Sequence, residues 1–219
     1  MLEMRIDVPG AGPVSASLHG QGGSTLLALA HGAGGTRTTP QLVRLADRLA
    51  TGGRRALLFN FPYSEAGRRA PDRPAALEAT VRAVAQHARE QLAPARLVLG
   101  GRSMGGRMAS QCVAAGLACE ALLLLAYPLH PPGQPGQLRD AHLPRIGTPM
   151  LFVQGTRDAF ARSDLLEATL ARLQPRARLC SIADGDHSFG VPARAGRRPA
   201  EVEAGVAASI EEWLAALGL

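Results

Sequence analysis

The chain has 219 residues, of which 46% are hydrophobic and 19% are charged, a balance that is typical of a globular protein and excludes a disordered chain. The net charge of +6 comes from basic residues that are all Arg; because they are scattered and aromatic residues make up only 4%, we expect no nucleic-acid partner. The longest apolar run, 121–127, is far shorter than the roughly 20 residues that cross a bilayer, so we expect no membrane partner.

Short apolar runs alternate with longer helical patterns along the chain. Residues 4–8 and 14–19 flank a turn rich in Pro and Gly, which predicts an antiparallel hairpin. Further strands are predicted at 25–30, 56–59, 96–99, 121–126, 150–153 and 178–182. Helices are predicted at 40–49, 74–92, 104–117, 163–173 and 201–217. Wholly apolar strands separated by helices indicate the α/β class: a mainly parallel sheet with helices on both faces, as a single domain over residues 1–219.

Two Pro-rich loops, 61–73 and 127–147, interrupt this alternation. Both follow the carboxyl end of a predicted strand, where open α/β sheets bind ligands, and loops of this length usually shape a site. Because the chain has no room for a separate lid domain, we expect a minimal cap and an open site. The residues expected to contact substrate there are Tyr63, Tyr127, His130 and Phe189.

The segment Gly101-Arg102-Ser103-Met104-Gly105 matches the pattern G-x-S-x-G. It follows a predicted apolar strand and begins a predicted helix, which is the context that a nucleophile elbow requires. Small flanking residues allow the strained turn, and the start of the helix favours developing negative charge. Ser103 is therefore the predicted nucleophile.

A serine hydroxyl needs a base to become a good nucleophile. His187 is the preferred candidate because it lies in a loop after the last predicted strand and before the last helix. His130 and His142 lie in the long loop 127–147 and remain alternatives. His31 ends a strand beside a Gly-rich loop, where we expect it to order the loop rather than to take a proton.

The base in turn needs a carboxylate that fixes its tautomer. Asp158 is the preferred candidate because it lies just past the strand predicted at 150–153. The order Ser103, Asp158, His187 is the order of α/β-hydrolases and differs from that of chymotrypsin-like and subtilisin-like enzymes. The alternatives are Asp186, Asp184 and Asp164.

Acyl transfer also needs hydrogen-bond donors for an oxyanion. One candidate is the backbone N–H of Met104, directly after the nucleophile. The other should come from the loop His31-Gly32-Ala33-Gly34-Gly35, which is similar to the HGGG loops of esterases. Ala33 is the preferred second donor, and Gly34 is the alternative.

Together these residues resemble the α/β-hydrolase superfamily over nearly the whole chain. Three further stretches resemble a small group of dienelactone-hydrolase-like proteins: Phe59-Asn60-Phe61-Pro62-Tyr63, Tyr127-Pro128-Leu129-His130-Pro131-Pro132-Gly133 and Leu138-Arg139-Asp140-Ala141-His142-Leu143-Pro144. That group holds mostly uncharacterised bacterial hydrolases, a eukaryotic testis-expressed protein and a subunit of the nonspecific-lethal chromatin complex. The resemblance implies a serine hydrolase fold, although dienelactone hydrolases proper use Cys where this chain has Ser103.

These observations predict a serine hydrolase that cleaves ester or thioester bonds of a small-molecule acyl substrate. The alternatives are a catalytically silent interaction module, an acyltransferase and a peptidase on the same three residues. No cofactor and no metal are expected, because Cys112, Cys119 and Cys180 form no ligand pattern. With an odd number of Cys and no visible secretory signal, we expect a cytoplasmic protein that is a monomer or homodimer.

Overall fold

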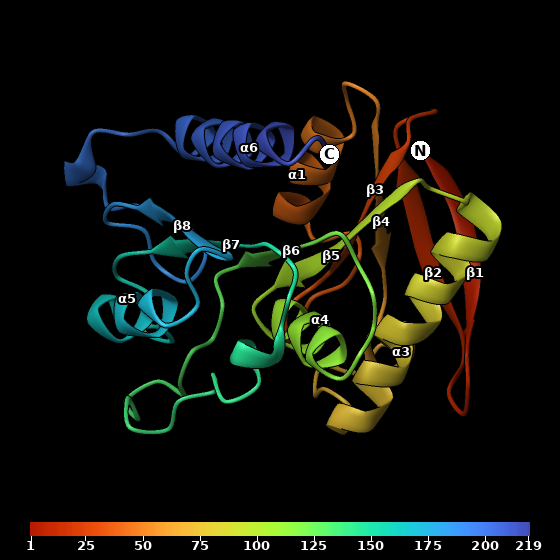
Figure 1. Cartoon of the computed structure of the whole chain (residues 1–219), viewed down its shortest axis with the longest axis horizontal. Coiled ribbons are helices and arrows are strands. Elements are labelled where there is room, and N and C mark those ends of the chain that lie inside the picture. The colour runs from red at the N-terminus through yellow and green to blue at the C-terminus, as the bar shows by residue number, and fades with distance from the viewer.

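A single sheet of eight strands runs through the computed structural model, which describes all residues 1–219 (Figure 1). The strand order is β1-β2-β4-β3-β5-β6-β7-β8. The strands are β1 (Leu2–Val8), β2 (Gly12–His19), β3 (Thr25–Ala30), β4 (Arg54–Phe59), β5 (Arg96–Arg102), β6 (Ala121–Leu125), β7 (Met150–Gly155) and β8 (Ala177–Ile182). Strands β3 to β8 are mutually parallel, whereas β1 and β2 form an antiparallel hairpin that joins the sheet through β4. The α/β fold and the N-terminal hairpin predicted from the sequence are therefore confirmed.

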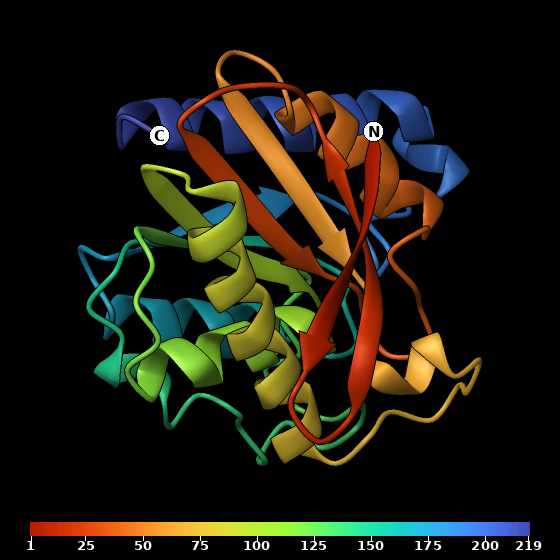
Figure 2. The same cartoon turned by 90° about the vertical axis from the view of Figure 1, so that its right-hand side faces the viewer.

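Helices cover both faces of the sheet. They are α1 (Pro40–Leu49), α2 (Pro62–Glu65), α3 (Pro74–His87), α4 (Met104–Ala114), α5 (Ser163–Ala171) and α6 (Pro199–Ala216). Helices α1 and α6 lie on one face, while α3, α4 and α5 lie on the other (Figures 1 and 2). The sheet therefore separates two apolar cores. The central strands face both cores, which is why they are apolar at nearly every position. No helix combines the length and the apolar character that crossing a membrane requires.

Most predicted element boundaries differ from the structure by a few residues, and three of the differences bear on the arrangement of the fold. The loop predicted at 61–73 begins with the short helix α2, whose first residue is Pro62. Strand β5 continues past the predicted end at residue 99 as far as Arg102, since glycines at 100 and 101 allow neighbouring backbones to approach closely. The predicted helix 74–92 ends as α3 at His87 and continues as one π-helical turn over Ala88–Leu92.

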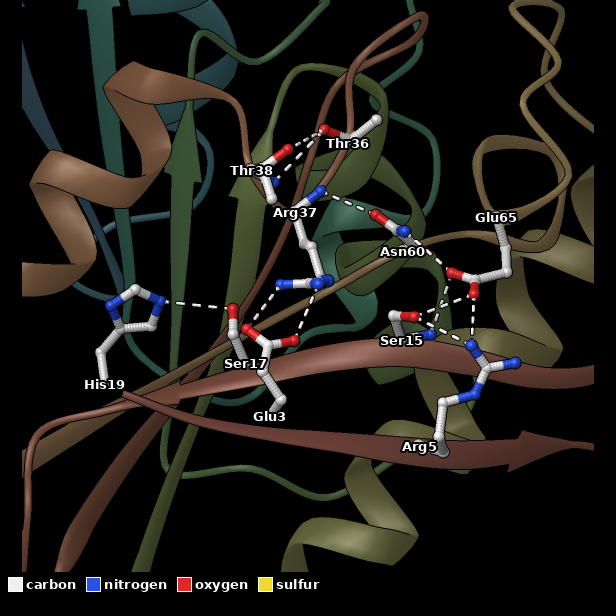
Figure 3. A network of polar contacts seen from close by, with 10 residues as sticks. All are labelled: Glu3, Arg5, Ser15, Ser17, His19, Thr36, Arg37, Thr38, Asn60 and Glu65. Atoms are coloured by element: carbon white, nitrogen blue, oxygen red, sulfur yellow. Dashed lines mark hydrogen bonds and ion pairs between the residues drawn. The ribbon is translucent and has the colours of Figure 1, made fainter.

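A polar network fixes α2 to the N-terminal hairpin (Figure 3). The Glu65 carboxylate accepts hydrogen bonds from the Ser15 backbone N–H at 3.0 Å, the Ser15 hydroxyl at 2.8 Å and the Asn60 amide at 2.9 Å, and it pairs with Arg5 at 2.6 Å. Burial raises the pKa of Glu65, but these hydrogen bonds and the Arg5 charge outweigh it and bring the pKa to about 2. The network positions α2, which reaches the Gly-rich loop after β3.

The substitution Glu65→Gln is expected to lower the free energy of unfolding at pH 7 by about 2 kcal/mol, because charged hydrogen bonds are replaced by neutral ones. A carboxylate whose pKa is lowered in the folded state stabilises that state above its unfolded pKa and ceases to do so as the pH falls through its folded pKa. The free energy of unfolding, measured with urea, should therefore fall more steeply for the wild type than for the variant as the pH falls from about 5 toward 2. The exposed Glu90→Gln variant is the matched control, and equal pH slopes for Glu65→Gln and wild type would contradict this role.

Candidate active site

Ser103 occupies a sharp turn between β5 and α4. Its φ is 49° and its ψ is −115°, a left-handed conformation that costs a residue with a side chain roughly 1–3 kcal/mol. The Ser103 N–H donates to the Leu125 carbonyl at 2.8 Å, and the Ser103 carbonyl accepts the Arg107 N–H at 3.1 Å. The turn is thus fixed both to the neighbouring strand β6 and to the first turn of α4, which holds the hydroxyl beyond the edge of the sheet.

Close backbone contacts explain why glycines surround Ser103. A Cβ added to Gly105 would lie 2.6 Å from the His31 carbonyl oxygen, and one added to Gly101 would overlap the Ala30 carbonyl. Both contacts join the elbow to the end of β3. A methyl group at either position would therefore push the Gly-rich loop after β3 away from Ser103.

The sheet topology brings three of the predicted residues together. Ser103, Asp158 and His187 follow β5, β7 and β8, whose carboxyl ends lie at the same edge of the sheet. The His187 Nε2 lies 2.9 Å from the Ser103 hydroxyl, and the His187 Nδ1 lies 2.8 Å from a carboxylate oxygen of Asp158. The Asp158 side chain is fully buried, whereas the imidazole of His187 is 25% exposed. This hydrogen-bonded order allows a proton to pass from the hydroxyl to the imidazole while the carboxylate holds the ring.

Two residues that the sequence pattern did not single out hold this arrangement in place. The amide of Gln154, at the end of β7, donates to the Asp158 carboxylate at 2.5 Å, and the Phe160 backbone N–H donates to its other oxygen at 2.8 Å. The Phe160 ring lies over the imidazole of His187 with 4.3 Å between the ring centroids. A buried Gln in an otherwise apolar strand, four residues before an Asp, is the signal that could have identified Gln154.

Arg102, directly before Ser103, reaches the loop that carries His187. Its guanidinium donates to the His187 carbonyl at 2.8 Å, to the Ser188 hydroxyl at 3.2 Å and to the Gln41 side chain at 2.9 Å. It also lies 5.8 Å from the centre of the Phe189 ring, within the range of a cation–π contact. Burial lowers the pKa of Arg102, while the charges of Asp158 and Asp186 raise it. The side chain therefore joins the nucleophile turn to the histidine loop.

The Gly-rich loop after β3 passes beside Ser103, since a Cβ on Gly32 would lie 3.5 Å from the Ser103 Cβ. His31 Nδ1–H donates to the Gly32 carbonyl at 2.8 Å, and His31 Nε2 accepts the Phe61 N–H at 3.2 Å. Burial lowers the pKa of His31, so its imidazole is neutral and acts as a brace for the loop.

Tyr63 on α2 holds the other side of this loop. Its hydroxyl donates to the Gly32 carbonyl at 3.3 Å, and burial raises its pKa although the Gly34 backbone N–H faces the hydroxyl. The Ala33 N–H makes no hydrogen bond within the protein. Neither loop donor, the N–H of Ala33 or that of Gly34, forms a hydrogen bond within the protein, and that of Gly34 faces Tyr63.

For three of the four residues expected to contact substrate, the prediction is wrong, because the structure buries their side chains. Tyr63 and Tyr127 are fully buried, and the Tyr127 hydroxyl donates to the Arg139 carbonyl at 2.7 Å, so both aromatic rings belong to the core. His130 is only 3% exposed; its Nδ1 lies 2.8 Å from the Pro131 carbonyl, and its Nε2 accepts the Arg162 N–H at 3.0 Å. Phe189 alone keeps partly exposed surface. Buried aromatic residues of this kind fill space between elements and cannot touch a ligand from outside.

The alternative acids Asp186 and Asp164 and the alternative base His142 have other partners. Asp186 accepts the N–H groups of Ser188 and Gly190 at 2.7 and 2.8 Å and so shapes its own turn. Asp164 pairs with Arg162, and its pKa falls to about 2 chiefly through the hydrogen bond from that residue. His142 Nε2 lies 2.8 Å from the Ser110 hydroxyl. No group of three or more His, Cys, Asp or Glu side chains is arranged to hold a metal ion.

Comparison with known proteins gives one family and several similar folds. Residues 23–215 match the family described as alpha/beta hydrolase domain. A lidless α/β serine hydrolase of Xanthomonas campestris is 20% identical, with a TM-score of 0.74 and coverage of 97% of this chain and 94% of that one. Dienelactone hydrolase from Anabaena variabilis is 20% identical, with a TM-score of 0.75 and coverage of 97% and 95%. Est1E from Butyrivibrio proteoclasticus is 16% identical, with a TM-score of 0.74 and coverage of 97% and 99%. At these identities the similarity of the structures concerns the fold.

Proposed function

The chain belongs to the alpha/beta hydrolase domain family. We propose that it is a serine hydrolase acting on the ester or thioester bond of a small acyl substrate. The observation that supports the proposal most strongly is the continuous path of hydrogen bonds from the Ser103 hydroxyl through His187 to Asp158. The path supports nucleophilic catalysis because it combines an activated hydroxyl with a base whose tautomer is fixed.

In the proposed reaction, the Ser103 oxygen attacks the carbonyl carbon while His187 Nε2 takes the hydroxyl proton. The buried carboxylate of Asp158 accepts the Nδ1–H and stabilises the imidazolium that forms. His187 then gives the proton to the leaving alcohol or thiol, and an acyl-enzyme on Ser103 remains. A water molecule, deprotonated by the same imidazole, releases the carboxylic acid and restores the hydroxyl.

The oxyanion of each tetrahedral intermediate is proposed to accept the backbone N–H groups of Met104 and Ala33. Met104 is the first residue of α4, so its N–H has no acceptor one turn earlier in the helix. The Ala33 N–H is free within the protein, and it directly follows Gly32, which lies beside Ser103. Two fixed donors of this kind lower the barrier by several kcal/mol, since removal of one costs about 3 kcal/mol in enzymes of this chemistry.

The proposal is tested by initial rates with p-nitrophenyl butyrate and with the butyryl thioester of N-acetylcysteamine. We expect saturable hydrolysis of at least one of them and a loss of at least about 10³-fold in the His187→Gln variant, because the base is removed. His87→Gln on α3 is the matched control and should keep the wild-type rate. A folded wild-type protein that shows no rate above spontaneous hydrolysis would instead favour a silent interaction module.

A further inference from the structure

A basic pocket lies beside Arg107 on α4. It has a volume of about 370 Å³ and lies between α4 and the segment that follows β6. Its lining consists of Arg107, Gln111, Arg139, Ala141, His142 and Arg145. Arg107 is one helical turn after Ser103 and Gln111 is two turns after it, which places the pocket about 6–12 Å along the helix from the nucleophile.

The positive charges of this basic pocket have no partners. None of the guanidinium groups of Arg107, Arg139 and Arg145 forms an ion pair with a carboxylate. Burial and the like charge of Arg139 both lower the pKa of Arg107. Arg107 and Arg139 lie close enough to repel one another and neither has an ion-pair partner, so the fold carries an electrostatic cost at this place. An anion bound among them would remove that cost.

The nearby carboxylates do not neutralise the pocket. Asp140 accepts hydrogen bonds from Arg172 at 2.6 Å and from Thr169 at 3.3 Å, and neither donor lines the pocket. Glu78 on α3 acts on Arg107 only through space, without an ion pair. Asp140 likewise acts on His142 only through space. The basic pocket therefore keeps a net positive charge that a ligand can meet.

Hydrogen bonds hold the His142 ring and the backbone of Arg139 at the edge of the basic pocket. His142 Nε2–H donates to the Ser110 hydroxyl at 2.8 Å, and this hydroxyl donates to the Arg107 carbonyl at 2.8 Å. Burial and the charges of Arg107 and Arg145 lower the pKa of His142 to about 4, so the imidazole is neutral while it holds the Ser110 hydroxyl. The Arg139 N–H donates to the Leu129 carbonyl, and the Arg139 carbonyl accepts a hydrogen bond from the Tyr127 hydroxyl.

We propose that this basic pocket binds a phosphate group. Guanidinium groups are planar donors that bind the oxygens of phosphate in pairs, and a dianion matches three unpaired cations better than a single carboxylate does. The phosphate can belong to the substrate, or it can be a free phosphate ion that occupies the pocket as an effector. The first source rests on the proposed function and makes the substrate an acyl ester of a short phosphorylated alcohol, with its phosphate one to two helical turns from the reacting carbonyl.

Binding is tested first, by calorimetric titration of the protein with inorganic phosphate at constant ionic strength. We expect one phosphate per chain and an affinity at least about tenfold lower in Arg139→Gln/Arg145→Gln, since each lost charged hydrogen bond is worth roughly that factor. Arg96→Gln/Arg178→Gln removes the same charge from exposed positions in β5 and β8 and should bind like the wild type. No binding by the wild type, or equal loss in both variants, would overturn the proposal.

The source of the phosphate is tested with 1-butyrylglycerol 3-phosphate and 1-butyrylglycerol, which differ only in the phosphate. If the substrate carries it, the ratio of the two kcat/KM values should fall at least about tenfold in Arg139→Gln/Arg145→Gln and stay unchanged in the control variant. If free phosphate is the ligand, that ratio should not change, and added phosphate should alter the hydrolysis of 1-butyrylglycerol. The titration needs no turnover, so an inactive protein that still binds phosphate would contradict the proposed function and leave the basic pocket intact.

Discussion

The Ser103→Ala variant is expected to lose at least about 10⁴-fold in kcat toward p-nitrophenyl butyrate, because no other group can form the acyl-enzyme. A residual rate above water should remain, since substrate binding and the oxyanion donors are retained. The variant should fold normally: alanine is no more strained than serine at a φ of 49°, and the Ser103 backbone hydrogen bonds do not involve the hydroxyl. Circular dichroism and thermal melting check this point.

Ser163→Ala is the matched control for this loss. Ser163 begins α5, and its hydroxyl makes only a long hydrogen bond of 3.4 Å to the Thr156 carbonyl. This variant should keep the wild-type kcat. A Ser103→Ala protein that is folded and still turns over at a rate close to the wild type would show that the nucleophile lies elsewhere.

The second large effect is expected for Asp158→Asn, which should lower kcat by about 10⁴-fold with little change in KM. The carboxylate accepts hydrogen bonds from Gln154, Phe160 and His187, whereas a side-chain amide offers one acceptor oxygen. The NH₂ group of that amide would face at least one of these donors, so at least one of the three hydrogen bonds is lost. The tautomer of the His187 imidazole is then no longer fixed. The imidazolium would also lose the buried negative charge that stabilises it.

Asp186→Asn is the matched control for this variant, because Asp186 is the neighbour of His187 in sequence and the alternative acid. Its carboxylate accepts only the N–H groups of its own turn. We expect a loss of less than about tenfold in kcat, from a small displacement of the histidine loop. A larger loss for Asp186→Asn than for Asp158→Asn would assign the carboxylate role to Asp186.

Most of the fold could be predicted because burial on both faces leaves a simple pattern in the sequence. The runs at 25–30 and 121–125 contain almost no polar residue, and both are wholly buried strands at the centre of the sheet. The short helix α2 could not be predicted, since four residues beginning with Pro give no periodic pattern. Strand β5 ends later than predicted because its last residues are glycines and Arg102, which carry no apolar signal.

The candidate site was less completely predictable. Residues at strand ends can be placed at one edge of the sheet from topology alone, which is why the sequence could predict that Ser103, Asp158 and His187 lie together. Whether a loop aromatic faces the site or the core depends on packing between distant segments, so the burial of Tyr63 and Tyr127 could not be predicted. For the same reason, the contacts of Gln154 and Phe160 are visible only in the three-dimensional arrangement.

The most direct measurement of the central claim is mass spectrometry of the protein after reaction with a fluorophosphonate. This reagent reacts with a serine whose hydroxyl is activated by a neighbouring base. We predict a single adduct per chain, located on the peptide that contains Ser103 and absent from the His187→Gln variant. A folded wild-type protein that remains unlabelled, or that carries the adduct on another residue, would contradict the account.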